Sequence, residues 1–146
     1  MGTTSASVEL PYPAEIVFRV ATRVADLPRW LPEVVEAELL DPELTSGSRV
    51  RLRLGPAAGG AVISGVIDAL RPPEEVEISG SGGPIRVDVR VRLASLTPSS
   101  TRVDLRLELQ TPAFLGFIAK EAERRIAAEL PGSLERFRAL VDAEPA

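Results

Sequence analysis

Residues 112–143 read PAFLGFIAKEAERRIAAELPGSLERFRALVDA, and this stretch decides the fold. Its apolar positions recur every three or four residues, which places them on one stripe of a helix. The stripe consists of Phe114, Leu115, Ile118, Ala122, Ile126, Leu130, Leu134, Phe137 and Val141. Most of the charged residues, Glu121, Glu123, Arg124 and Glu129 among them, fall off this stripe. The spacing therefore predicts one long amphipathic helix that needs an apolar surface to cover.

Residues with known helix preferences mark the start and the middle of this segment. Thr111 can cap a helix N-terminus, and Pro112 suits the first helical turn. Pro131-Gly132 falls in the middle, where the proline ring removes one backbone hydrogen bond. We therefore expect a helix from Pro112 onward with a kink at Pro131.

The preceding chain alternates between apolar and charged residues, as strands with one buried face do. The clearest runs are 85–93 and 102–109, in which Val or Leu alternates with Arg, Asp or Glu. Further strands are expected at 7–10, 34–40, 49–54, 61–70 and 75–78, with short helices at 15–22 and 26–30. Gly65 is a candidate β-bulge. The predicted order is a strand, two short helices, six strands and the long helix, an α+β fold whose apolar sheet face the helix covers.

The charges on the last two strands predict their register. If paired residue numbers sum to 194, then Arg86 faces Glu108, Asp88 faces Arg106 and Arg90 faces Asp104. Each opposite-charge pair is worth about 0.2–1 kcal/mol, whereas a sum of 196 sets Arg90 against Arg106. We therefore expect the register of 194.

The composition limits the class of protein. The 146 residues are expected to form one domain, residues 1–146, with 45% hydrophobic residues and a net charge of −4. The absence of cysteine excludes disulfides and thiol chemistry, and the absence of histidine removes the usual general base and the commonest metal ligand. No run is long and apolar enough for a membrane span, and the first residues, MGTTSA, lack the basic and apolar regions of a secretory signal. We expect a cytoplasmic protein without metal or cofactor. We also expect no nucleic-acid partner, because the arginines lie on strands without interleaved aromatic residues.

Three short motifs resemble a known family. Residues 13–18 (PAEIVF) are similar to the family's aP-x-x-V-F/W opening of the first helix, and residues 26–32 (DLPRWLP) to its D-x-x-x-W-x-P segment. Gly47 is similar to the glycine before the third strand. On these residues the chain resembles the START-like (SRPBCC) superfamily, in particular the polyketide cyclase/dehydrase and lipid-transport family. The Trp-Leu-Pro segment at 30–32 is also similar to the coenzyme-Q-binding branch.

The resemblance implies a helix-grip fold: a curved seven-stranded antiparallel sheet wrapped around the long C-terminal helix, with an apolar cavity between them. Members bind lipids, polyketides, plant hormones or quinones, and a few catalyse cyclisation. The inward rows of the strands would then contact a small apolar ligand, while without a cavity they are ordinary core. The candidate ligand-binding residues are Trp30, Leu52, Leu54, Ser64, Val89, Val91, Leu105, Leu107, Phe114, Phe117 and Ile118.

Two other functions remain open. A polyketide aromatase/cyclase-like enzyme would need polar side chains in the cavity, and Asp68 is the one candidate acid because its strand has no clear outward face. An interaction module would have a filled core and would dock a partner, or a second copy in a homodimer, through its arginine-rich sheet face. Trp30 can touch a ligand or simply pack the short helices against the sheet.

Overall fold

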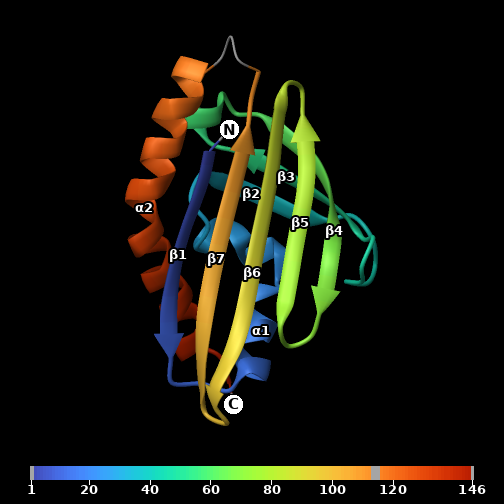
Figure 1. The fold of residues 1–146 in the computed structure, drawn as a ribbon. Helices are drawn as coiled ribbons and strands as arrows, with labels where there is room; N and C mark the ends of the chain where they lie inside the picture. The colour runs from blue at the N-terminus through green and yellow to red at the C-terminus, as the bar shows by residue number, and fades with distance from the viewer. Residues whose placement is uncertain (1, 113–115, 146) are drawn as a thin grey trace.

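The computed structural model describes residues 2–112 and 116–145. Its elements follow the predicted order of a strand, two short helices, six strands and a long helix, with one additional three-residue helix between the third and fourth strands. They are β1 (Gly2–Leu10), α1 (Ala14–Ala21), η1 (Val24–Arg29), β2 (Val34–Leu39), β3 (Arg49–Leu54), η2 (Pro56–Ala58), β4 (Val62–Arg71), β5 (Glu75–Gly82), β6 (Ile85–Thr97), β7 (Ser100–Gln110) and α2 (Gly116–Asp142). The strands form one antiparallel sheet in the order β1-β7-β6-β5-β4-β3-β2. The sheet curls so that β2 and β3 lie behind β6 and β5, and α2 runs along its β1 edge (Figure 1). The predicted helix-grip fold is confirmed.

Two glycines allow the backbones of β4 and β5 to approach each other closely. Gly65 and Gly80 are cross-strand partners on the inward face. A Cβ atom on Gly80 would lie 2.8 Å from the Gly65 Cα and 2.7 Å from a methyl of Ile63, closer than real side chains come. The bulge predicted at Gly65 is wrong, because the register shift lies between Ile67 and Ala69, with Asp68 as the extra residue. Gly65 instead permits a close approach of two backbones.

The long helix α2 packs against the rest of the protein through the predicted apolar stripe. Ala122, Leu130, Leu134, Phe137 and Val141 are all buried. The C-terminal half packs most closely, with Phe137 and Val141 fully buried, whereas Ile126 in the N-terminal half is only partly covered. The helix continues through Pro131, and Thr111 and Pro112 lie outside it. Phe114 and Leu115 lie outside the described residues.

The predicted register of β6 and β7 is wrong. The strands pair with a sum of 196, so that Asp88 faces Glu108 and Arg90 faces Arg106. The reason lies on the other side of β6, where β5 places Glu77 opposite Arg90 and Glu75 opposite Arg92.

The charges of β6 and β7 are therefore balanced by other partners. Arg90 and Arg92 reach Glu77 and Glu75 at 2.9 and 2.8 Å. On β7, Arg102 pairs with Asp104 and Arg106 pairs with Glu108, at 3.1 and 3.0 Å along the same strand. The register therefore depends on the charges of three strands, β5, β6 and β7, whereas the prediction considered the charges of β6 and β7 only.

The outer face of the sheet carries ladders of ion pairs, as predicted. On β3, Arg49 pairs with Asp41, Arg51 with Glu38 and Arg53 with Glu36. These side chains are largely exposed, so each pair stabilises the fold by at most about 1 kcal/mol. Their main effect is to keep this face solvated and leave the concave face for α2.

Candidate ligand-binding site

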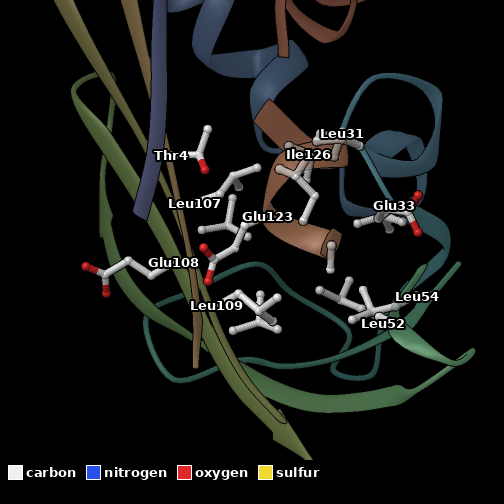
Figure 2. A pocket seen from close by; sticks show the side chains of 16 residues that line it. Thr4, Leu31, Glu33, Leu52, Leu54, Leu107, Glu108, Leu109, Glu123 and Ile126 are labelled. Carbon is white, nitrogen blue, oxygen red and sulfur yellow. The ribbon is translucent and has the colours of Figure 1, made fainter. Parts of the chain in front are cut away.

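A small pocket lies between the concave face of the sheet and the N-terminal half of α2. Its free volume is about 50 Å³. The walls come from β1, β2, β3, β6, β7, η2 and α2. Residues 31–33, which lie between η1 and β2, complete them. The lining residues are Thr4, Leu31, Pro32, Glu33, Val34, Leu52, Leu54, Ala58, Val87, Val89, Leu107, Glu108, Leu109, Ala122, Glu123 and Ile126 (Figure 2). The inward rows of three strands thus meet one face of a helix in a mainly apolar space.

Four predicted ligand-binding residues line this pocket. Leu52 and Leu54 come from β3, Val89 from β6 and Leu107 from β7. The period of two along each strand turns these residues inward, and the curl of the sheet brings the three strands together under α2. Whether they touch a ligand remains a prediction.

Trp30, Val91 and Leu105 lie outside this pocket. Trp30 is fully buried and packs on Phe137, and together with Val91 it borders a separate void of about 20 Å³ under η1. Leu105 is buried in the core. The side chain of Trp30 therefore holds η1 against α2, and its indole Nε1 has no hydrogen-bond partner among the described residues.

Ser64 and Asp68 do not point inward as expected. Both are exposed on the outer side of β4, whose inward residues are Ile63 and Ile67. Asp68 follows Ile67 at the bulge, which explains why the sequence pattern left its face ambiguous. Phe114 lies outside the described residues, and Phe117 and Ile118 lie on α2 with side chains outside the described set.

Glu33 has an unusual position at the edge of the pocket. Its φ angle is +60°, a left-handed conformation that a side chain makes unfavourable. The backbone N–H of Gly55 donates to the Glu33 carbonyl at 2.9 Å, which holds this turn against the end of β3. The Glu33 Oε2 atom is buried without a hydrogen-bond partner among the described residues. A Cβ on residue 55 would come within 2.8 Å of this oxygen, so a larger residue there would displace the end of the Glu33 side chain.

Glu123 is one of the pocket residues that the sequence analysis missed. It was placed off the apolar stripe, yet it is half-buried and lines the pocket. Glu123 precedes Leu130 by seven residues and Phe137 by fourteen, and such positions share one face of a helix. That spacing was the signal in the sequence, because both partners are core residues.

The groups whose pKa is displaced lie away from the pocket. A hydrogen bond from Arg92, with help from Arg71, lowers the pKa of the Glu75 carboxyl on the outer sheet face. A hydrogen bond to Asp142 raises the pKa of the Tyr12 phenol near the C-terminal end of α2. These shifts report ion pairing and hydrogen bonding that hold elements together.

The described residues contain no group of three or more His, Cys, Asp or Glu side chains placed to hold a metal ion. Within the same ranges, no helix is both long enough and apolar enough to span a membrane.

Comparisons with known proteins agree with the fold. The family model described as "Polyketide cyclase / dehydrase and lipid transport" matches residues 1–142. A comparison with curated proteins finds no match.

Solved structures share the architecture at low sequence identity. The Zhui aromatase/cyclase from Streptomyces sp. R1128 is 18% identical over 96% of this chain and 90% of its own, with a TM-score of 0.69. A START superfamily protein from Mycobacterium smegmatis is 19% identical over 92% of this chain and 97% of its own, with a TM-score of 0.66. The protein MLL2253 from Mesorhizobium loti is 17% identical over 99% of this chain and 100% of its own, with a TM-score of 0.74. Identities this low establish the shared fold alone.

Proposed function

We propose that this chain, which belongs to the polyketide cyclase/dehydrase and lipid-transport family, binds a small apolar molecule between its curved sheet and α2. The observation that carries this proposal is the apolar pocket at that place, with Leu52, Leu54 and Leu107 on its walls. Removal of apolar ligand surface from water supplies about 25 cal/mol per Å², before the costs of association.

The size of the pocket means that binding includes an opening step. About 50 Å³ holds only a few water molecules, whereas sites for drug-sized ligands measure about 300–1,000 Å³. The N-terminal half of α2 forms one wall through Ala122, Glu123 and Ile126. The other half is anchored by Phe137 and Val141, so the wall opens by movement of the helix N-terminal to Pro131.

Binding accounts for this pocket better than catalysis does. A cyclase needs several polar groups that converge on the substrate. Of the four polar residues that line the pocket, Glu108 and Glu33 direct their carboxylates away from its centre (Figure 2). Only Thr4 and Glu123 then remain as polar groups that could contact a bound molecule. Two such groups suit a site that orients a ligand.

The test is mass spectrometry of an organic extract of the purified protein, together with native mass spectrometry of the intact sample. We expect a co-purified apolar compound at near-stoichiometric amount. The Ala122→Leu substitution would fill the pocket and remove this compound. Ala128→Leu, on the exposed side of the same helix, is the matched control and would retain it. An empty wild-type protein that shows no thermal shift with any apolar compound would overturn the proposal.

A further inference from the structure

The charge inside the pocket has one sign. The lining residues with polar side chains are Thr4, Glu33, Glu108 and Glu123. None of the described lining residues is a lysine or an arginine. Glu108 lies on the outer side of β7, where its carboxylate accepts hydrogen bonds from Arg106 and Thr3 at 3.0 and 3.3 Å. The other two glutamates, Glu33 and Glu123, border the pocket, and neither forms an ion pair with a residue that the structure describes.

Glu123 borders the pocket from α2. Figure 2 shows its side chain directed from α2 toward β7, near the side chains of Leu107 and Leu109. Among the described residues it makes no hydrogen bond and no ion pair. The hydroxyl-bearing side chain of Thr4 lies on the same side of the pocket, whereas the Glu33 carboxylate lies on the other side and points away (Figure 2).

A carboxylate in this position has an energetic consequence. Glu123 is half-buried, and an apolar molecule bound beside its carboxylate would remove water from the charged oxygens, which weakens binding unless the ligand donates hydrogen bonds to them. Exposed positions on α2 accommodate a glutamate without that cost, as Glu129 does. A ligand that donates to Glu123 would offset the lost hydration, and an anionic ligand would add repulsion to it.

We propose that Glu123 orients the ligand, and that the pocket takes apolar molecules that carry a hydroxyl or amino hydrogen-bond donor and rejects anionic ones such as fatty acids. This inference rests on the proposed function, because it concerns the same pocket. The apolar body of the ligand lies against Leu52, Leu54 and Val89, and its donor group faces the carboxylate of Glu123 near β7.

Four compounds built on one small ring system test the proposal: indanol, aminoindan, methoxyindan and indan carboxylate. Titrations of the isotope-labelled protein, followed by NMR, give each dissociation constant and show which backbone amides respond. We expect indanol and aminoindan to bind about 10- to 100-fold more tightly than methoxyindan, the range of a hydrogen bond to a charged acceptor. Indan carboxylate should bind most weakly, and the responding amides should be those around Ala122 and Ile126.

Variants of two glutamates on the same helix separate the contribution of this carboxylate from general effects of charge. Glu123→Leu should reduce the difference between indanol and methoxyindan to about twofold or less, and Glu129→Leu should leave it unchanged. Glu123→Gln keeps an acceptor without the charge, so it should improve binding of indan carboxylate even if the leucine variant folds poorly.

Equal affinity of the wild type for indanol and methoxyindan would overturn the inference and leave the proposed function standing. So would a donor preference that survives in Glu123→Leu. Failure of all four compounds to bind, together with a purified protein that carries no apolar compound and shows no thermal shift with any, would overturn both.

Discussion

The indole of Trp30 packs against the ring of Phe137, with the ring centroids 4.6 Å apart and the planes tilted by 49°. Both residues are fully buried. The contact joins the segment after η1 to the C-terminal half of α2, more than 100 residues later in the chain. Because α2 is anchored here and carries the pocket wall at its other half, this pair supports the site without lining it.

Phe137→Ala is therefore expected to destabilise the protein by about 3–5 kcal/mol, since it removes a large buried ring and leaves a cavity. Chemical denaturation followed by the fluorescence of Trp30, the only tryptophan, measures this directly. Leu96→Ala, at an exposed position, is the control and should change stability by less than about 0.5 kcal/mol. A loss of less than 1 kcal/mol in Phe137→Ala would contradict the anchoring role.

The second prediction concerns Glu75, which is 6% exposed and forms ion pairs with Arg71 and Arg92 at 2.6 and 2.8 Å. These partners lower its pKa in the folded state, so the unfolded chain takes up the proton first as the pH falls. The stabilisation is therefore complete at neutral pH and is lost below about pH 4, as the pH falls through the folded pKa.

Glu75→Gln should destabilise the protein by about 1–3 kcal/mol at pH 7 and should lose less stability than the wild type between pH 6 and pH 3. Urea denaturation at a series of pH values provides the comparison. Glu43→Gln, an exposed side chain, should follow the wild-type curve. Parallel curves for Glu75→Gln and the wild type would show that the ion pairs carry no net stability.

The third prediction compares two glycines. Gly80→Ala should destabilise the fold by about 1–3 kcal/mol, because the new Cβ would press on the backbone of Gly65 and on Ile63. Gly132→Ala should instead stabilise it by about 0.5–1 kcal/mol, since residue 132 lies inside α2 and meets only the flexible end of Arg136 at 3.4 Å. Thermal denaturation of both variants gives the signs. Equal effects of the two substitutions would contradict the close approach of β4 and β5.

The fourth prediction concerns Pro131, which interrupts the hydrogen-bond ladder of α2 between the pocket wall and the anchored half. Pro131→Ala restores one backbone donor and should slow hydrogen exchange of the amides from Glu121 to Leu130. If the wall opens by movement of this segment, the variant should also bind apolar ligands more slowly, which stopped-flow measurements detect. Unchanged exchange rates would place the opening motion elsewhere, for example in η1.

Some site residues could be predicted from the sequence, and others could not. Leu52, Leu54, Val89 and Leu107 were found because alternation along a strand is a local property that assigns each side chain to one face. The same rule misplaced Ser64 and Asp68, since their strand is apolar on both sides and contains a bulge at Asp68. Glu123 was missed because its charge was taken as a sign of exposure, although its spacing from Leu130 and Phe137 places it on the inner face.

The sequence alone specifies the order and type of the main elements and, for strands that alternate between apolar and polar residues, the face that turns inward, because periods of 2 and 3.6 residues are set by local backbone geometry. The tertiary structure alone decided the partners of those faces. Arg90 finds Glu77 on β5 and faces Arg106 on β7, since a strand balances its charges against both neighbours at once. The packing of α2 on the sheet also brings Glu123 and Leu107 into one pocket, because no local pattern specifies which residues of a helix and a strand meet.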